Sequence, residues 1–381
     1  MKSVLLVGCG GYGAGYVNAL LDHGADYGWK LAAIADPYAS ASAVWERIRE
    51  NAIPLYDTPE DFYKNNKADV AIIATPIMLH ARQAIACLRG GSDVLLEKPI
   101  TGSSKEAEEI LRVRDEEGRK LMLGFQWCAN DPMLALKRDA DAGRFGRLLS
   151  MKALVLWPRD FAYFNRGTRW AGKKYSSDGT PIFDSIASNA TAHYLYNMLW
   201  LAGEGYAATD VTDFRFAAAK ANDIETYDTV ILTAKTTGGA SLFFGASHAI
   251  SRAENQNPIF VYRFEKATAY FSREEEKRLE VIFDNGERID YGLSDNNALE
   301  QKIPKAAAYF DGTGENFCPA EGAVRHITLL EKMWENCDEM PRFREEAIVH
   351  EPGMVWVKGL ADVMQNCYKD ARLPKEGELS L

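Results

Sequence analysis

Short apolar runs alternate with amphipathic stretches over the first 125 residues of the chain. Near-continuous apolar runs are typical of strands that are covered on both faces, and helical spacing separates one run from the next. Such alternation predicts a parallel sheet with right-handed crossovers. The strands are predicted at residues 4–7, 31–35, 70–74, 94–96 and 121–123, and helices at 14–25, 79–89 and 106–117.

A different pattern begins after residue 147, where strand-like segments follow one another with few helices between them. Thr237-Gly238-Gly239 and Asp284-Asn285-Gly286 have the composition of hairpin turns. We therefore predict two domains, residues 1–145 and 146–381. Two late helices are expected to cover the second sheet or to dock on the first domain, at about 324–336 and 354–368. The strands of the second domain are predicted at 148–157, 211–219, 229–235, 240–249, 259–264, 267–271 and 279–283.

Composition removes several classes of protein. The 381 residues carry a formal net charge of −10, which disfavours binding to nucleic acids and to anionic membranes. No window approaches the ~18 apolar residues of a membrane span. The cysteines are scattered without a disulfide-like or metal-binding spacing, so a cytoplasmic protein with reduced thiols and no metal site is expected.

The end of the first predicted strand carries a glycine signature. Glycines 8, 10 and 13 satisfy the spacing G-x-G-x-x-G between a strand and a helix, which suits a tight turn close to a pyrophosphate. Asp36 ends the second strand, where a carboxylate can accept hydrogen bonds from ribose hydroxyls and repel a 2′-phosphate. The pattern favours NAD over NADP. The predicted cofactor loop consists of Gly8, Gly10, Gly11, Tyr12 and Gly13.

A second candidate group follows the fourth predicted strand, in Glu97-Lys98-Pro99. In a dinucleotide-binding sheet, ligands lie at the carboxyl ends of the strands. A lysine at this position would lie near the nicotinamide, where its ammonium group can hydrogen-bond a substrate hydroxyl and lower the pKa of that hydroxyl. Lys98 is therefore a candidate for both substrate binding and catalysis.

Several motifs in this order resemble the Gfo/Idh/MocA oxidoreductases. The residues that carry the likeness are Gly8-Cys9-Gly10-Gly11-Tyr12-Gly13, Asp36, Ala74-Thr75-Pro76, His80, Glu97-Lys98-Pro99 and Gly124-Phe125-Gln126. The resemblance covers the first 145 residues or so well and the rest more loosely. It implies an α/β protein: an N-terminal Rossmann domain with a doubly wound parallel sheet, followed by an α+β domain with a large, mostly antiparallel open sheet. It also implies a homodimer or homotetramer formed through that sheet.

The resemblance also implies roles for individual residues. Thr75, Pro76 and Gln126 would line the cofactor groove, Glu97 would hold the nicotinamide ribose, and Lys98 would contact both cofactor and substrate. His80 is assigned to the same groove, and a purely structural, packed histidine is the alternative for it.

A helix predicted from residue 189 to residue 203 supplies the candidate acid–base group. Asn189 and His193 are four residues apart, so they would share one helix face. Members of the resembling family commonly have an aspartate where this chain has Asn189, and an amide cannot stabilise an imidazolium as a carboxylate does. Lys98 could take over the proton transfer, or Asp184 could return a carboxylate to the site. A structural role remains open for His193, and helix capping remains open for Asp184.

The segment before this helix is rich in basic and aromatic residues, which suit a polar, sugar-like ligand. Arginines can clamp a carboxylate or a phosphate, so an acidic or phosphorylated sugar stays open despite the negative net charge. A solvated connection that packs one tryptophan is the plain alternative. The candidate substrate-binding residues here are Trp157, Arg166, Arg169 and Trp170, beside Lys98, Asp184 and His193.

Three functions follow as hypotheses. The first is an NAD-dependent oxidoreductase acting on a hydroxyl or carbonyl group of a sugar, polyol or sugar acid, with Lys98 polarising the reacting oxygen and His193 exchanging the proton. The second is a glycoside-cleaving or epimerising enzyme that removes a hydride to NAD and returns it. The third is a non-catalytic regulator that senses a dinucleotide.

Overall fold

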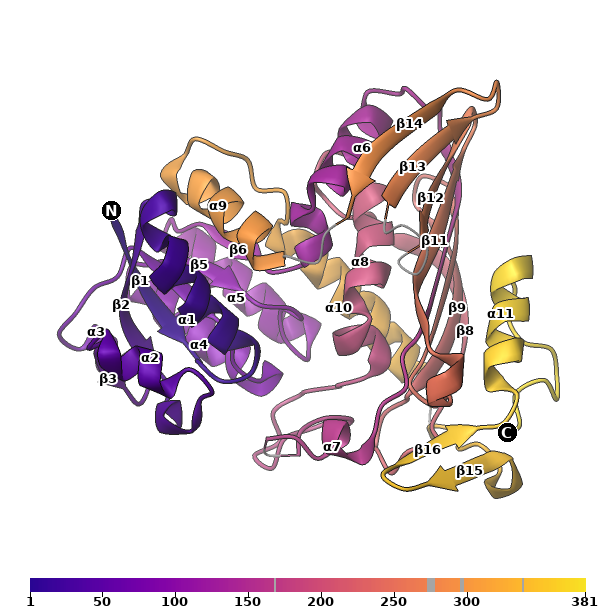
Figure 1. The fold of residues 1–381 in the computed structure, drawn as a ribbon, viewed down its shortest axis with the longest axis horizontal. Helices are drawn as coiled ribbons and strands as arrows, with labels where there is room; N and C mark the ends of the chain where they lie inside the picture. The colour runs from indigo at the N-terminus through magenta and orange to yellow at the C-terminus, as the bar shows by residue number, and fades with distance from the viewer. Residues whose placement is uncertain (168, 273–277, 295–297, 338) are drawn as a thin grey trace. The chain divides into compact units, whose positions relative to one another are not determined.

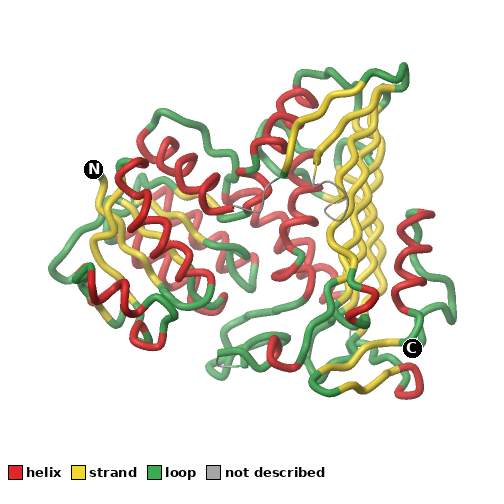
Figure 2. The backbone as a smooth tube through the Cα atoms, viewed as in Figure 1, coloured by secondary structure: helices red, strands yellow, loops and turns green. Residues whose placement is uncertain are grey.

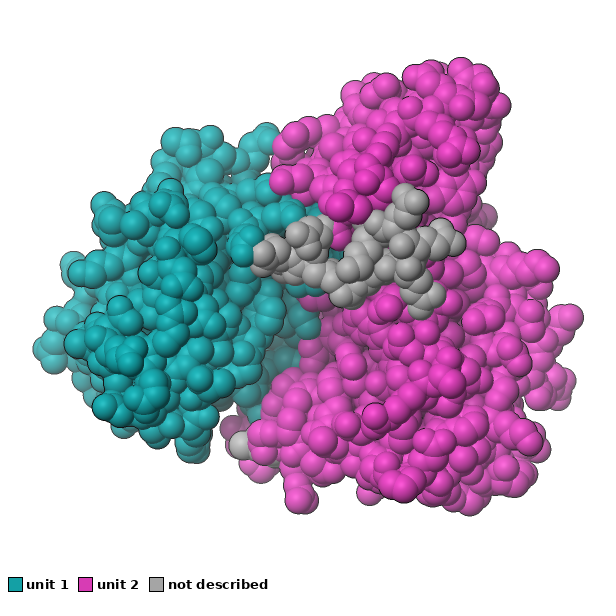
Figure 3. All heavy atoms as spheres, in the orientation of Figure 1, with its two compact units in different colours: residues 1–130, 296–324 teal, residues 131–295, 325–381 magenta. Residues whose placement is uncertain are grey.

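The described part of the chain divides into two compact units, which Figure 3 colours separately. Unit 1 contains residues 1–130 and 296–324, and unit 2 contains residues 131–295 and 325–381. The computed structural model describes residues 1–167, 169–272, 278–294, 298–337 and 339–381.

The division differs from the expected boundary at residues 145 and 146 in two ways. Helix α6 (Asp131–Asp141) belongs to unit 2 because it packs on strand β14 (Arg288–Leu293), where Tyr291 donates a hydrogen bond to Asp139. Residues 296–324 return to unit 1, although they follow the strands of unit 2 in the sequence. Strand and helix periodicity carries no information about such a return.

Unit 1 contains a six-stranded sheet in the order β3-β2-β1-β4-β5-β6, and every neighbouring pair is parallel. The order reverses between β1 and β4, which makes this the switch point at which ligands bind in such sheets. This is the predicted doubly wound Rossmann sheet. Its strands are β1 (Lys2–Val7), β2 (Trp29–Ala35), β3 (Leu55–Tyr56), β4 (Val70–Ile73), β5 (Asp93–Leu96) and β6 (Leu121–Leu123).

Helices cover both faces of this sheet, because right-handed crossovers that run in opposite directions from β1 place their helices on opposite faces. The predicted helices at 14–25, 79–89 and 106–117 correspond to α1, α4 and α5 (Figure 1). Two short helices on the way from β2 to β4 were not predicted. The bounds are α1 (Tyr12–His23), α2 (Trp45–Glu50), α3 (Pro59–Tyr63), α4 (His80–Arg89) and α5 (Ser104–Glu116).

Helix α9 (Ala298–Asp311) completes unit 1 from the far end of the sequence and packs against α1. Phe310 stacks on Trp29 with 6.2 Å between the ring centroids, and the ammonium group of Lys120 donates a hydrogen bond to the Tyr309 carbonyl at 2.9 Å. The backbone N–H of Leu123 donates to the carbonyl of Cys318 at 3.0 Å. The late segment is therefore an integral part of the Rossmann unit.

Unit 2 is built on an eight-stranded sheet in the order β14-β13-β12-β11-β7-β10-β9-β8. Figure 2 shows the strands of this sheet in yellow. Every pair in it is antiparallel except β7–β10, so the predicted large, mostly antiparallel sheet is confirmed. The two predicted hairpin turns join β9 to β10 and β13 to β14. The strands not yet given are β7 (Leu148–Leu156), β8 (Val211–Ala219), β9 (Thr229–Thr236), β10 (Ser241–Ser247), β11 (Gln256–Phe264), β12 (Ala267–Ser272) and β13 (Arg278–Phe283).

Both faces of this sheet carry helices. Helix α8 (Ala192–Leu201) lies on one face, and α11 (Leu360–Asp370) lies on the other, across β7 and β10 (Figure 1). Phe243 of β10 meets Tyr368 of α11 edge to face at 6.1 Å. The terminal helix thus covers the sheet of its own unit. Helix α10 (Ala320–Glu335) matches the helix predicted at 324–336 and begins in unit 1 before it continues in unit 2.

The predicted helix at 354–368 is wrong over its first residues. Residues 354–357 form strand β16 (Met354–Val357), which pairs with β15 (Ile348–Glu351) in a separate hairpin. Gly359 then adopts a φ of 74°, and the helix starts only after it. A short apolar run of this kind is compatible with either element, so the sequence alone could not separate them. None of the helices in the described part of the chain combines the length and apolar character that a membrane span needs.

Candidate active site

The glycine turn after β1 closes tightly onto the end of β4. Gly8 has a φ of 87°, and a Cβ on it would lie 2.7 Å from Cγ2 of Thr75. A Cβ on Gly13 would lie 2.2 Å from the carbonyl oxygen of Gly8, so the first turn of α1 rests directly on the loop. Gly11 precedes α1 without a side-chain capping bond, which leaves the helix N-terminus clear of a capping side chain. The turn therefore suits the close approach of a pyrophosphate.

Gly13→Ala is expected to lower both NADH affinity and thermal stability. The added methyl group overlaps the Gly8 carbonyl and must push α1 away from the turn, which we expect to lower Tm by roughly 2–10 °C. Gly10→Ala is the matched control, because its Cβ would meet no atom within 4 Å. It should weaken NADH binding and keep the wild-type Tm. NADH fluorescence titration and thermal melts measure both effects, and a wild-type Tm for Gly13→Ala would contradict the close packing.

Asp36 fastens the glycine turn to the end of β2. Its Oδ2 accepts a hydrogen bond from the backbone N–H of Cys9 at 2.9 Å, and its Oδ1 accepts one from the N–H of Tyr38 at 2.8 Å. Burial and the neighbouring Asp36 carboxylate raise the pKa of the Cys9 thiol to about 12, so this thiol stays protonated. The half-buried carboxylate places negative charge beside the turn, which disfavours a 2′-phosphate.

His80 ties two strand-end loops together. It is 1% exposed, and its ring nitrogens lie 2.8 Å from the carbonyl oxygens of Pro99 and Thr75. Burial lowers the pKa of His80, although these backbone contacts and Glu97 act in the opposite direction. Both ring nitrogens are thus engaged with the backbone, which favours the structural alternative over a direct ligand contact. His80 holds the loop after β4 against the loop after β5.

The remaining predicted residues of unit 1 lie at neighbouring strand ends. Thr75 and Pro76 follow β4, Glu97 and Lys98 follow β5, and Gln126 begins the turn after β6. Because β1, β4, β5 and β6 are adjacent and parallel, their carboxyl ends share one edge of the sheet. Lys98 and Gln126 are both half-buried there. The structure therefore collects at one edge the residues that the sequence assigned to the cofactor.

Glu97 lies in a buried network that the sequence analysis missed. Its Oε1 accepts a hydrogen bond from the Tyr16 hydroxyl at 2.6 Å and an ion-paired hydrogen bond from Lys302 of α9. Lys302 is fully buried and also donates to the carbonyl of Gly124 at 3.3 Å. Its ammonium group lies 5.1 Å from the ring centroid of Tyr12. Burial disfavours the charge of Lys302, but Glu97 and Tyr12 more than offset this and raise its pKa.

One sequence signal could have pointed to Lys302. The apolar face of α9 contains Ile303, Ala306 and Phe310, all buried, and Lys302 is on the same side of the helix. A lysine is almost never fully buried without a charged partner, so a lysine on an apolar helix face indicates a buried ion pair. The sequence does not say which carboxylate pairs with it, because Glu97 is 205 residues away.

The parallel pair β7 and β10 gathers the polar residues of unit 2. The backbone N–H of Trp157 donates to the Ser247 carbonyl at 2.9 Å, and the N–H of Arg159 donates to the His248 carbonyl at 3.3 Å. Nδ1 of His248 in turn lies 2.7 Å from the Trp157 carbonyl. The ends of these two strands, which are far apart in sequence, therefore form one cluster.

Arginines and aromatic rings stack beyond this cluster. Arg166 lies 3.8 Å from the ring centroid of Tyr163 and 4.6 Å from that of Trp170, so two predicted substrate residues, Arg166 and Trp170, are brought together. Arg159 lies 4.9 Å from the same Tyr163 ring and 5.6 Å from the Trp157 ring. Arg169 is exposed and has a φ of 58°, and its backbone N–H donates to the Arg166 carbonyl at 3.0 Å.

Asn189 and His193 do not belong to one continuous α-helix, contrary to the prediction. Asn189 lies in a π-helical turn (Ile186–Ala190) that Ser185 caps, and α8 starts only at Ala192. The helical i, i+4 spacing therefore does not apply to this pair. Asp184 does return a carboxylate to this position, because its Oδ1 accepts a hydrogen bond from Nδ2 of Asn189 at 2.8 Å. Its Oδ2 accepts one from the N–H of Gly172 at 2.7 Å, so Asp184 is not the helix cap.

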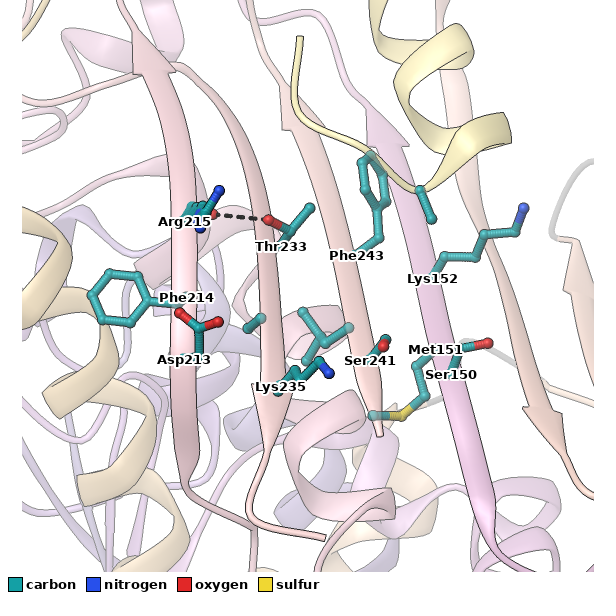
Figure 4. A pocket seen from close by; sticks show the side chains of 13 residues that line it. Ser150, Met151, Lys152, Asp213, Phe214, Arg215, Thr233, Lys235, Ser241 and Phe243 are labelled. Atoms are coloured by element: carbon teal, nitrogen blue, oxygen red, sulfur yellow. Dashed lines mark hydrogen bonds between the residues drawn. The ribbon is translucent and has the colours of Figure 1, made fainter. Parts of the chain in front are cut away.

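A separate cavity of about 310 Å³ lies on the face of the unit 2 sheet that also carries α11 (Figure 4). Lys152, Asp213, Arg215 and Lys235 line it together with Ala371, which follows α11. None of the predicted site residues lines this cavity. Within the described ranges, no group of three His, Cys, Asp or Glu side chains is placed to hold a metal ion.

Comparison with known proteins agrees with the architecture. Residues 2–125 match the family model GFO_IDH_MocA, described as an oxidoreductase family with an NAD-binding Rossmann fold. Inositol 2-dehydrogenase 2 of Saccharopolyspora erythraea is 30% identical over 156 residues, which are 39% of this chain and 43% of that protein. The match thus spans less than half of the relative.

Two solved structures share the fold of both units. The WlbA dehydrogenase of Bordetella pertussis, in complex with NADH and UDP-GlcNAcA, aligns with a TM-score of 0.69 and 21% identity over 88% of this chain and 95% of that one. An oxidoreductase of Agrobacterium radiobacter, in complex with NAD⁺, L-tartaric acid and magnesium, aligns with a TM-score of 0.70 and 18% identity over the same shares. Residues 2–125 are thus similar to the NAD-binding Rossmann domain of the Gfo/Idh/MocA oxidoreductases.

Proposed function

We propose that this protein is an NAD-dependent oxidoreductase that transfers a hydride between nicotinamide and a hydroxyl or carbonyl group of a sugar, polyol or sugar acid. The observation that carries the proposal is the edge of the unit 1 sheet, where the glycine turn, Asp36 and Lys98 follow parallel strands. The similarity to an inositol 2-dehydrogenase supports a polyol or sugar, and the WlbA complex with UDP-GlcNAcA supports a sugar acid.

The residues of unit 1 fit NAD. A side chain at Gly8 or Gly13 would fill the turn, and the N-terminus of α1 faces it without a capping side chain. Asp36 would bind the adenosine ribose, Thr75, Pro76 and Gln126 would line the groove, and Glu97 would bind the nicotinamide ribose. Bound NAD would accept or supply the hydride. The residues named above would position the cofactor and provide the charges around it.

Lys98 and His193 would handle the charge and the proton of the reacting group. The Lys98 ammonium would polarise the reacting oxygen, and the His193 imidazole would exchange the proton with it. The Asn189 side chain would help to orient the reacting groups. The hydrogen bond from its amide nitrogen to Asp184 supports this role, because it fixes the amide in one orientation. Trp157, Arg166 and Trp170 would contact the substrate from the ends of β7 and the following loop.

We further propose a cytoplasmic homodimer or homotetramer that forms through the unit 2 sheet. Helix α11 packs on β7 and β10, and the same face of the sheet extends beyond them over β11 and β12. Tyr270 of β12, which pairs with Val261 of β11, is 43% exposed there. A large apolar side chain on an uncovered sheet face suits burial against a second copy.

A cofactor and substrate screen tests the function. Purified protein is incubated with NAD or NADP and a panel of inositols, polyols, sugars and sugar acids while NADH absorbance is followed. At least one compound should be oxidised, with kcat/KM for NAD roughly 10-fold or more above that for NADP, because the Asp36 carboxylate repels a 2′-phosphate. Product without any net absorbance change would instead support transient hydride removal. Better turnover with NADP would refute the role of Asp36.

A further inference from the structure

A cavity of about 380 Å³ in unit 2 lies between the loop after β7 and the β15–β16 hairpin. Its lining comes from segments that are distant in sequence. The backbone N–H of Phe161 donates to the Gly353 carbonyl at 2.7 Å, which holds the loop and the hairpin together. Pro158, Arg159, Asp160, Tyr163, Arg252 and Met354 line the cavity.

Two arginines, Arg159 and Arg252, line this cavity, and neither forms an ion pair with a carboxylate among the residues that the structure describes. Nε of Arg252 donates a hydrogen bond to the thioether sulfur of Met354 at 3.3 Å, which is a weak acceptor. The one acidic residue of the lining, Asp160, accepts a hydrogen bond from the N–H of Tyr163 at 3.0 Å as the cap of helix α7 (Phe161–Phe164). The lining therefore carries uncompensated positive charge in a chain of net charge −10.

Aromatic rings flank the guanidinium group of Arg159. It lies near the rings of Trp157 and Tyr163, at 5.6 and 4.9 Å. Contact with an aromatic ring occupies the face of a guanidinium and leaves the N–H groups at its edge. Nε of Arg159 is buried and has no acceptor among the described residues. A buried charged donor without an acceptor is costly, and an oxygen of a ligand would satisfy it.

His248, which lies beneath this loop, adds no positive charge to the site. His248 is 2% exposed, and its pKa falls to about 3 because of burial and the positive charges of Arg159 and Arg166. It is neutral, with Nδ1 donating to the Trp157 carbonyl. Positive charge at this place therefore belongs to the arginines alone, and they keep it at every physiological pH.

We propose that Arg159 and Arg252 bind the carboxylate or phosphate group of an acidic sugar in this cavity. Two guanidiniums from adjoining loops match such a group, since each can offer paired N–H donors to its oxygens. Tyr163 and Met354 complete the lining with apolar surface for the ligand body. The inference rests on the proposed function only in taking the acidic sugar to be the substrate.

Calorimetry on the whole protein tests the site with three probes: D-glucuronate, D-glucose 6-phosphate and D-glucose. One of the acidic probes should bind and D-glucose should bind at least about 10-fold more weakly. Arg159→Gln and Arg252→Gln should each weaken the acidic probe roughly 10-fold to 100-fold, while D-glucose binding stays unchanged. Arg147→Gln, at an exposed arginine paired with Glu265, is the control and should bind like wild type.

The outcomes separate this site from the proposed function. Preference for glucuronate or for glucose 6-phosphate identifies a carboxylate or a phosphate as the anion. Equal binding of D-glucose and both acidic probes would overturn the proposal, as would wild-type affinity in Arg252→Gln, whose exposed side chain can be replaced without unfolding. Arginine-dependent binding of an acidic probe without turnover by NAD would keep the site and refute the redox function. Turnover of neutral sugars with NAD, without binding of either acidic probe, would support the redox function and refute the anion site.

Discussion

Lys98→Met is expected to lower kcat by roughly 10²-fold to 10⁴-fold on the best substrate of the screen. The methionine side chain fills a similar volume without an ammonium group, so the negative charge that develops on the reacting oxygen loses its stabilisation. Affinity for NADH should stay close to that of wild type. Steady-state kinetics and NADH fluorescence titration give the two quantities.

Lys105→Met is the control for this variant, because Lys105 is an exposed lysine on α5 of the same unit. It should have wild-type kcat and wild-type NADH affinity. An unchanged kcat in Lys98→Met would remove Lys98 from the mechanism. A large loss of NADH affinity at unchanged kcat would make Lys98 a cofactor ligand and not a group that acts on the substrate.

Lys302→Met is expected to destabilise the protein by about 3–5 kcal/mol, because it leaves Glu97 buried without its counter-charge. The same change should weaken NADH binding, since Glu97 follows β5 immediately before Lys98. Denaturant unfolding and NADH titration measure the two effects. Lys305→Met on the same helix, at a half-buried lysine whose ammonium group donates a hydrogen bond to the Gln301 carbonyl, should change stability far less.

The double variant Glu97→Gln with Lys302→Met separates charge from packing. Removing both charges should restore most of the lost stability, while NADH affinity stays low because the carboxylate is gone. The stability deficit of Lys302→Met should not vary from neutral to mildly alkaline pH. The pKa of Lys302 is raised from 10.5, so the ion pair is complete below that value and is lost only as pH rises through the higher folded value. A double variant as unstable as the single one would contradict the ion-pair explanation.

The sequence predicted the edge of the unit 1 sheet well because its signals are local. Five of its six strands are short apolar runs that the sequence predicted, and the two-residue strand β3 was missed. Asp36, Thr75 and Lys98 lie within two residues of the ends of predicted strands. Parallel strands then bring these ends to one edge whatever the details of packing. No comparable rule places Lys302, because the first stretch of unit 2, residues 131–295, lies between it and its partner Glu97 in the sequence.

The acid–base region of unit 2 shows the opposite case. The spacing of Asn189 and His193 suits an α-helix, but a π-helical turn and the break at Thr191 separate them. One residue more in a turn changes which side chains share a face, and residue types alone do not announce it. The sequence suggested Asp184 as one possible source of a carboxylate near Asn189 but could not select it, because a loop carboxylate has many possible partners.

The return of residues 296–324 to unit 1 bears on how the protein is made on the ribosome. N-terminal domains commonly fold while the rest of the chain is still being synthesised. Here the first unit cannot finish in that order, because α9 and Lys302 are translated only after the whole first stretch of unit 2. Until then Glu97 lacks its ion pair with Lys302, and α1 lacks its contacts with α9. The Rossmann unit can therefore complete its packing only after α9 has been synthesised.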